Sequence, residues 1–228
     1  MSVADSREQI LATIRAAVGT SVRRDRASAP EFNLRNSVRE TRVDLTEQFR
    51  SEVIRIGGRF HHAPNGESVC GYIEQVAEAE GASTVICSNA HLAAEFGIAN
   101  RLAANGIAFI ADPTASDILT NAARADIGVT GVDYALAETG SLVLLARPGQ
   151  PRSVSLLPPV HIALIRPEQI IRGFDELFEL LRADFEATGV KSAVTFITGP
   201  SRTADIELTL VVGVHGPQQL HAVLIAGQ

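Results

Sequence analysis

Three polar turns carry the residue types that could do chemistry in this sequence. The first runs from Gly128 to Ser141 (GVTGVDYALAETGS) and places Glu138 shortly before an apolar run. A carboxylate next to a buried strand would be partly desolvated, which favours its neutral form and suits general acid–base or nucleophilic work. Asp133 is expected to cap a short helix that ends at Glu138. The alternative to a catalytic Glu138 is an ordinary helix C-terminal turn in which this residue has no catalytic role. The neighbours predicted to contact a ligand are Thr130, Gly131, Thr139 and Gly140.

A histidine ends the second turn. Residues 155–161 read SLLPPVH, and the Pro158-Pro159 pair fixes two backbone angles and removes two N–H donors, which makes a stiff corner. His161 then leads into an apolar run expected to be a buried strand. Two interpretations stay open: a core histidine bonded to backbone, or a group that binds ligand or transfers a proton as part of a catalytic site.

The third turn has the composition of an anion site. Two hydroxyls, a guanidinium and free backbone N–H groups follow a Gly-Pro turn, and such a set can bind phosphate or carboxylate. The residues predicted to bind the anion are Gly199, Ser201, Arg202, Thr203 and Asp205. Alternatively, Asp205 holds Arg202 in a structural ion pair. His215 follows in another tight turn as a further catalytic candidate, and we expect all three turns to converge on one pocket for a small anionic ligand.

Composition and charge exclude several classes of function. The chain of 228 residues has 20 basic and 26 acidic residues, for a net charge of −6, and lacks a basic stripe with interleaved aromatics, so no nucleic-acid partner is expected. It has neither GxxxxGK[ST] nor GxGxxG, so a nucleotide site is not supported. No apolar run reaches the ~18–20 residues that cross a bilayer. Without a signal-peptide core in residues 1–20, a cytoplasmic location is predicted.

The cysteine content limits the redox chemistry of the chain. An iron–sulfur cluster normally takes four thiolates, and a structural zinc takes four Cys or His ligands at close spacing. Cys70 and Cys87 cannot supply either set and are expected to be small buried hydrophobic residues. The sequence therefore predicts no metal site and no cofactor held by this chain.

The first 44 residues differ from the rest in composition and in hydrophobic pattern. Ser6 is expected to cap an amphipathic helix that ends at Gly19. The residues on its apolar face are Ile10, Leu11, Ile14 and Val18. Residues 20–44 are polar and Arg-rich, and they form either an extended arm that docks on the body or on another subunit, or a linker. We therefore divide the chain into an N-terminal helix and arm, residues 1–44, and a single α/β domain, residues 45–228.

From residue 45 onwards, helical and strand patterns alternate. Helices are expected to begin at Thr46, Ser68, Asn89 and Asp117, and strands to occupy 59–62, 84–87 and 107–111. Strands separated by helices require crossover connections and therefore pair in parallel. Further on, short connections between apolar runs favour mixed pairing. These runs are 142–146, 153–156 and 161–165, followed by a helix over 174–187 and strands over 193–198, 207–214 and 221–226. The predicted fold is α/β, with a mixed, mostly parallel sheet covered by helices on both faces.

Two long motifs give the sequence a family resemblance. The stretch GVTGVDYALAETGSLVLLARPGQPRSVSLLPPVHIALI, followed by ITGPSRTADIELTLVVGVHGPQQLHAVLI, closely resembles the lactate utilization protein C family, whose members are built on the LUD domain. The resemblance implies a fold like that of the sugar-phosphate isomerase and CoA-transferase superfamily. It also implies a role in oxidising L-lactate to pyruvate, alongside two iron–sulfur partner proteins.

Two functional hypotheses follow, and the sequence leaves both open. In the first, the chain is the component without an iron–sulfur cluster in a lactate-oxidising system and binds a small anion. In the second, it is a free-standing enzyme acting on a phosphorylated or CoA-linked small molecule. Glu138 would then be the base or nucleophile, assisted by His161 or His215, while Arg202 holds the anion. A weaker third possibility is a structural regulator with a vestigial pocket.

Overall fold

The structure, a computed structural model, describes residues 3–20, 44–111, 117–189, 192–204 and 210–226. The chain divides into two units, residues 1–41 and 42–228. In the first unit, α1 (Val3–Thr20) is a helix that begins before Ser6, so this residue lies inside the helix and does not cap it. The predicted arm falls almost wholly outside the described residues. Of the described helices, none has the length and apolar character needed to cross a membrane.

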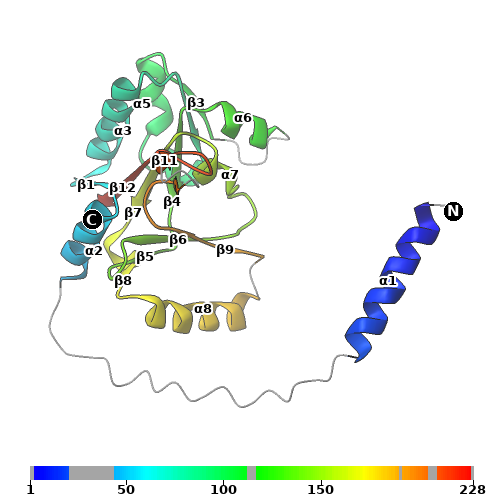
Figure 1. Ribbon diagram of the computed structural model, residues 1–228. Helices are drawn as coiled ribbons and strands as arrows, with labels where there is room; N and C mark the ends of the chain where they lie inside the picture. The colour runs from blue at the N-terminus through cyan, green and yellow to red at the C-terminus, as the bar shows by residue number, and fades with distance from the viewer. Residues whose placement is uncertain (1–2, 21–43, 112–116, 190–191, 205–209, 227–228) are drawn as a thin grey trace. The chain divides into compact units, whose positions relative to one another are not determined.

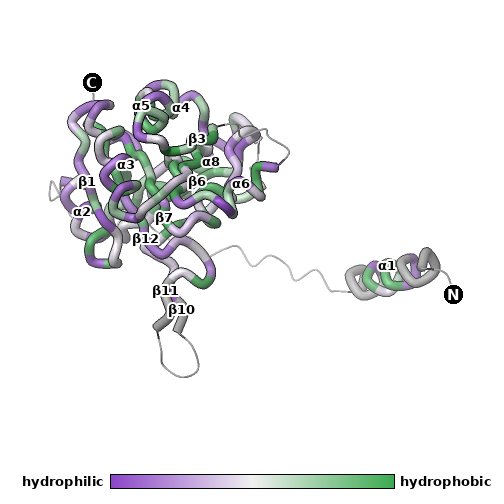
Figure 2. The backbone as a smooth tube through the Cα atoms, turned by 90° about the horizontal axis from the view of Figure 1, so that it is seen from above, coloured by the Kyte–Doolittle hydropathy of each residue, from purple (hydrophilic) through white to green (hydrophobic). Residues whose placement is uncertain are grey.

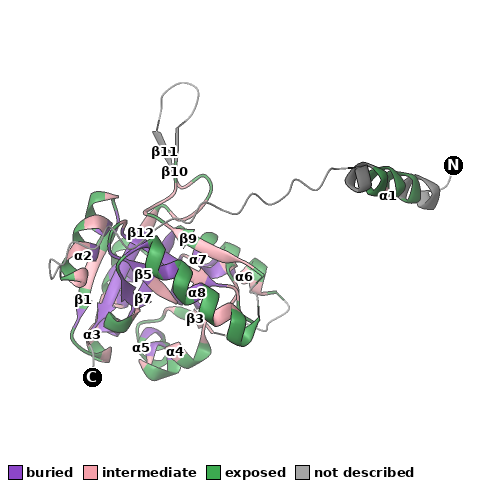
Figure 3. Cartoon of the chain, turned by 90° about the horizontal axis from the view of Figure 1, so that it is seen from below, coloured by how far each residue is buried: buried purple, intermediate pink, exposed green. Residues whose placement is uncertain are grey.

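A six-stranded parallel sheet lies at the centre of the second unit, with the strand order β1-β12-β7-β4-β2-β3 (Figure 1). Its strands are β1 (Arg59–Ala63), β2 (Thr84–Cys87), β3 (Ala108–Ile110), β4 (Ile127–Gly131), β7 (Val160–Ile165) and β12 (Gln219–Ile225). All six residues of β7 are buried, and Figure 3 shows β7 and β12 in the interior. A strand buried on both faces reads as a continuous apolar run, as His161–Ile165 does.

Helices cover both faces of this sheet, as predicted. They are α2 (Leu45–Arg55), α3 (Gly66–Glu80), α4 (Ala90–Glu95), α5 (Ile98–Ala104) and α6 (Ile118–Arg124). On one face, Val69 and Ile73 of α3 and Leu102 of α5 pack against the sheet in the largest apolar cluster. On the other face, Phe49 and Val53 of α2 pack with Leu220, Ala222 and Leu224 of β12. The predicted α/β fold with a mostly parallel sheet is confirmed.

Mixed pairing occurs in a separate sheet of four strands, in the order β8-β5-β6-β9, where β6 is antiparallel to β5 and β9 and β8 is parallel to β5. The run 161–165 was expected to take part in such pairing, but it is β7 of the parallel sheet and does not pair with β6. Its strands are β5 (Tyr134–Leu136), β6 (Ser141–Leu145), β8 (Ile170–Ile171) and β9 (Val194–Ile197). Helix α8 (Phe174–Thr188) packs Leu177 and Leu181 against this sheet and leaves its other side exposed, as Figure 3 shows. The remaining elements are α7 (Ser153–Leu156), η2 (Pro167–Gln169), β10 (Arg202–Ala204) and β11 (Leu210–Val212). Strands β10 and β11 pair with each other in a two-stranded antiparallel sheet. Figure 2 shows apolar (green) stretches among the helices and strands of the second unit.

Two predictions of local structure between β4 and β7 are wrong. Residues 153–156 form the helix α7 instead of a strand. Helix α7 lies directly on β4 because Gly128 has no side chain. A Cβ at this position would be 2.0 Å from the Val154 carbonyl oxygen. Asp133 does not cap a helix, because the residues after it form β5. Its carboxylate instead accepts a hydrogen bond of 2.7 Å from the backbone N–H of Leu145 and so fastens the end of β6.

The helix starts follow the capping chemistry closely, but not always at the predicted residue. Asn89 caps α4 through its side chain, as predicted, and Asp117 immediately precedes α6. Helix α2 is capped by Asp44 instead of Thr46, and α3 by Asn65 instead of Ser68. In these two cases the capping residue lies two and three positions before the predicted one, and its side-chain oxygen accepts from free N–H groups of the first turn.

Candidate functional site

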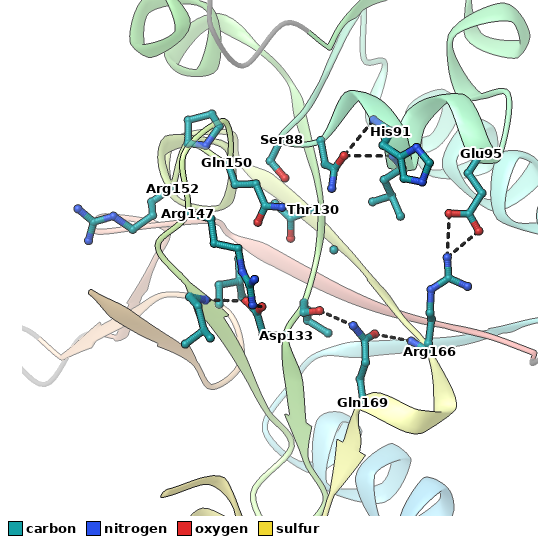
Figure 4. A pocket seen from close by; sticks show the side chains of 17 residues that line it. Ser88, His91, Glu95, Thr130, Asp133, Arg147, Gln150, Arg152, Arg166 and Gln169 are labelled. Carbon is teal, nitrogen blue, oxygen red and sulfur yellow. Dashed lines mark hydrogen bonds and ion pairs between the residues drawn. The ribbon is translucent and has the colours of Figure 1, made fainter. Parts of the chain in front are cut away.

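The order of the strands creates a crevice between β2 and β4. The chain leaves β2 for β3 on one side and then returns across β2 to β4 on the other. The connections that follow β2 and β4 therefore run in opposite directions, and open α/β sheets bind ligands at the carboxyl ends of such strands. A cavity of ≈ 300 Å³ lies at this point, lined by residues that follow both strands and by others from β6, α4 and η2 (Figure 4). We call it the switch-point cavity.

Two hydroxyl groups line this cavity at the ends of the two strands. Thr130 is in β4, and Ser88 directly follows β2, whose last residue pairs with Val129. The two residues are therefore next to each other across the strands and lie on the same face of the sheet. Both are buried. In the described part of the chain, the Ser88 hydroxyl has no hydrogen-bond partner, so it can turn towards a ligand.

Two arginines that line the cavity are each held by a carboxylate. Arg147, just after β6, forms an ion pair with Asp133. Arg166, just after β7, donates from Nη2 to both carboxylate oxygens of Glu95 at 2.6 and 2.8 Å. Each guanidinium has five N–H donors, and these contacts use only the Nη2 nitrogen of each arginine. Figure 4 shows both pairs beside the cavity. The N–H groups that these contacts do not use are available to a bound anion.

A glutamine fixes the backbone between these arginines and the sheet. The Gln169 side-chain oxygen accepts from the backbone N–H of Arg166 at 2.7 Å, and its amide donates to the Val132 carbonyl at 2.5 Å. The turn η2 is thereby tied to the segment that follows β4. This bridge positions the Arg166 side chain and the Thr130 side of the cavity relative to each other, which limits the reorganisation needed on binding.

The charges around the cavity favour a monoanion. Three arginines, the third being Arg152, face two carboxylates, so the lining has a formal charge of +1 with histidine neutral. The whole chain carries −6, so this surplus is local. Arg152 has no side-chain ion pair among the described residues and extends away from the centre in Figure 4. A small carboxylate, bound by guanidinium and hydroxyl donors, fits this lining best.

His161 lies beneath the cavity, fully buried in β7. Its Nε2 is 2.9 Å from the Thr130 hydroxyl oxygen. Burial lowers the pKa of His161 to about 3, with a further decrease caused by His221. The predicted alternative of a core histidine agrees with its burial, although its partner is a side chain that lines the cavity instead of backbone.

The third predicted turn lies at the other edge of the sheet. Gly199, Ser201, Arg202 and His215 line a second cavity of ≈ 630 Å³, together with Ser155. Ser201 accepts from the backbone N–H of His215 at 3.3 Å, and its own N–H donates to the Pro217 carbonyl, just before β12 begins. We call this the amino-end cavity, because β12 and β7 start beside it. Thr203 contributes backbone to β10, and Asp205 lies outside the described residues, so its predicted pairing with Arg202 has no structural account.

The register of the sheet separates the two cavities. Gly131, at the switch-point cavity, is paired with Leu164, four residues beyond Val160, the first residue of β7. The segment that leads into β12 lies beside the start of β7, because the Gln218 N–H donates to the Pro159 carbonyl. At ~3.3 Å per residue, the strand spans roughly 13 Å between these levels. The predicted convergence of the three turns on one pocket is therefore wrong: Thr130 and Gly131 line one cavity, and Ser201, Arg202 and His215 line the other.

Glu138 lines neither of these two cavities. It is exposed in the turn between β5 and β6, and its carboxylate lies against Gly173, where an added Cβ would be 2.2 Å from Oε2. The expected desolvation is wrong, because Glu138 is exposed. Thr139 donates to the Ser141 hydroxyl at 2.8 Å, and Gly140 has a φ of +66° with its Cα packed against the α2 backbone, so both residues shape the turn.

Several cavity residues were missed from the sequence. Ser88 and Asn89 directly follow a strand that was predicted correctly, so the rule that ligands bind at carboxyl ends could have found them. Arg147 and Arg166 also follow strands, but their carboxylate partners Asp133 and Glu95 are 14 and 71 residues away in sequence. No local pattern indicates these pairs.

Known proteins are similar in sequence to this chain over most of its length. A model of the LUD domain matches residues 46–225. The chain is 39% identical over 194 residues to lactate utilization protein C of Macrococcus caseolyticus, covering 82% of each. It is 33% identical over 183 residues to the protein of that name from Anoxybacillus flavithermus, covering 80% of each. It is also 32% identical over 222 residues to the uncharacterized protein YkgG of Escherichia coli, covering 93% of this chain and 95% of that one.

A solved structure shares the fold. The crystal structure of a DUF162 family protein from Deinococcus radiodurans superposes with a TM-score of 0.57, covering 81% of this chain and 98% of that chain. The sequences are 24% identical, so this similarity concerns the fold alone.

Proposed function

The chain belongs to the LUD domain family, and from this premise we propose that it acts in lactate utilization, with the switch-point cavity binding a small carboxylate such as lactate or pyruvate. Relatives that carry the name lactate utilization protein C support the first part of the proposal. The arrangement of Arg147, Arg166 and the hydroxyls of Ser88 and Thr130 around one cavity supports the second. This arrangement is the observation that carries the proposal.

The size and charge of the cavity favour these acids over larger substrates. A volume of ≈ 300 Å³ is at the lower end of the range of ligand pockets and suits a ligand of few atoms. The surplus of one positive charge matches a monocarboxylate, whereas a phosphate dianion would also meet the carboxylates of Asp133 and Glu95. The hydroxyls can hydrogen-bond the 2-hydroxyl of lactate or the 2-keto oxygen of pyruvate.

The oxidation itself requires partners in this proposal. Conversion of lactate to pyruvate removes two electrons and two protons, and the side chains around the cavity bind and orient but do not accept electrons. We propose that iron–sulfur lactate-utilization proteins receive the electrons, since the two thiols of this chain are too few for a cluster and both are buried. Co-purification of the full chain with those proteins, from cells growing on lactate, tests this part.

The binding proposal is tested by calorimetric titration of the full chain with L-lactate and pyruvate. Arg166→Met removes a guanidinium from the switch-point cavity, and the matched control Arg202→Met removes one from the amino-end cavity. Loss of a charged hydrogen bond costs about 1.5–3 kcal/mol, so we expect roughly 10- to 100-fold weaker binding for the first variant and unchanged binding for the control. Loss of binding in Arg202→Met alone, or no binding of either acid by the unmodified chain, would overturn the proposal.

A further inference from the structure

The contact between His161 and Thr130 leaves one ring nitrogen without a partner. His161 Nε2 is 2.9 Å from Thr130 Oγ1, and this is the only hydrogen bond of the ring in the described part of the chain. The other nitrogen, Nδ1, is buried and has no hydrogen-bond partner there. The ring is fully buried, while Thr130 reaches the lining of the switch-point cavity.

The ring carries a single proton at neutral pH, because burial lowers the pKa of His161 to about 3. Two arrangements of that proton are then possible. With the proton on Nδ1, Nε2 accepts from the Thr130 hydroxyl, and a buried N–H group has no acceptor. With the proton on Nε2, the ring donates to Thr130 Oγ1, and only a lone pair is left unpartnered. Buried N–H groups without a partner are rarer in proteins than unpartnered acceptors, which favours the second arrangement.

The second arrangement fixes what Thr130 can do. Once its oxygen accepts from His161, its own proton must be donated elsewhere, and no described protein acceptor receives it. The strand that carries Thr130 is fastened on both sides by β2 and β7, so the side chain keeps its place beside Ser88. The free direction for the hydroxyl proton is the cavity.

We propose that His161 is a positioning residue that donates from Nε2 to Thr130 and thereby makes the Thr130 hydroxyl an obligatory hydrogen-bond donor to the ligand of the switch-point cavity. The ligand group at this point is then an acceptor oxygen, such as a carboxylate or keto oxygen, and a group that can only donate is rejected. The identity of the ligand rests on the proposed function above, whereas the position of the proton on His161 does not.

Nitrogen NMR of the full chain with ¹⁵N-labelled histidine tests the proton position without any ligand. The chemical shifts of the two ring nitrogens show which of them is protonated, and the His161→Gln variant identifies the signals. We expect the Nε2–H form at neutral pH. The Nδ1–H form, or an imidazolium, would overturn the inference whether or not lactate or pyruvate binds.

Calorimetric titration with pyruvate tests the consequence for binding. In His161→Gln the side-chain amide can still donate to Thr130, so most of the affinity is retained. His161→Leu, of similar size, removes the donor and frees the Thr130 proton to take other directions, so we expect affinity to fall roughly 10-fold. Thr130→Val, which removes the hydroxyl, should weaken binding at least as much, and Thr130→Ser should restore it.

The outcomes separate the two proposals. Thermal melting first establishes that each variant is folded. If His161→Leu does not fold, Thr130→Val provides the test. Unchanged affinity in both His161→Leu and Thr130→Val would overturn the positioning role. If the unmodified chain binds neither acid, the proposed function fails, and the NMR result alone decides the inference.

Discussion

Two buried histidines should make the stability of this protein fall steeply in mild acid. His161 and His221 are both fully buried. Burial is the main cause that lowers their pKa values, to about 3 for His161 and to about 4 for His221, which bonds the Tyr72 hydroxyl at 2.9 Å. In the unfolded chain both titrate near 6.5, so the unfolded state binds protons first as the pH falls.

The sign and size follow from this difference. Stability from these groups is fully present above about pH 6.5 and is lost as the pH falls from there towards the folded values. Each histidine contributes a slope of about 1.4 kcal/mol per pH unit, so between pH 7 and pH 5 each costs about 2 kcal/mol. Together they remove about 4 kcal/mol, a large part of a typical domain stability of about 5–15 kcal/mol. His61, whose pKa is also lowered by burial, adds to the loss.

Urea unfolding followed by far-ultraviolet circular dichroism measures this directly, since the chain has no tryptophan. The control is the double variant His161→Gln, His221→Asn, in which glutamine keeps a donor for Thr130 and asparagine a partner for Tyr72. Asp and Glu side chains titrate mostly below pH 5, so this interval isolates the histidines. A loss of less than about 1 kcal/mol in the unmodified protein, or an equal loss in the double variant, would refute the reasoning.

Two further predictions concern packing and thiol reactivity. Gly128→Ala should destabilise the protein by about 3 kcal/mol in urea unfolding, because the alanine Cβ would overlap the Val154 carbonyl. The control is Gly71→Ala in helix α3, where the added Cβ meets open space, and it should stabilise the protein by about 0.5–1 kcal/mol. Equal effects of the two alanines would contradict the close approach of α7 to β4. Cys87 is fully buried and its pKa is raised to about 11, so it should resist a disulfide reagent at pH 8 until urea unfolds the chain. Rapid labelling of the folded protein at Cys87 would show that the strand end is open.

The fold was predictable where local pattern and burial agree. Helical and strand periods alternate up to β4, and that alternation requires parallel strands with crossover helices. The error at 153–156 has a physical reason: the residues Val154 and Leu156 favour a strand, but the segment is short, and α7 is held where it is by its contact with Gly128. A glycine in one strand decides the conformation of a segment 25 positions later, which no local pattern reports.

The candidate site was predictable only in part, because side-chain direction and long-range pairing decide it. Glu138 was chosen for the apolar strand beyond it, yet a turn residue can point away from the strand that it precedes, and this one is exposed. Thr130 was assigned to a polar turn, whereas it lies in β4, and from there it lines the switch-point cavity. The guanidinium of Arg166 becomes part of the cavity through Glu95, which the fold brings to it from α4.

The separation of the two cavities follows from chain direction. In a parallel sheet every strand starts at one edge and ends at the other, so a residue that follows its strand cannot share a crevice with one that precedes a neighbouring strand. Thr130 lies at the carboxyl end of β4, one residue before its last, whereas Ser201 and His215 lie in the segment that leads into β12. Classing each turn by whether it follows or precedes a strand of the parallel sheet would have separated them. It would also have directed attention to Ser88, which directly follows the strand beside Thr130 and so completes the pair of hydroxyls on which the binding proposal depends.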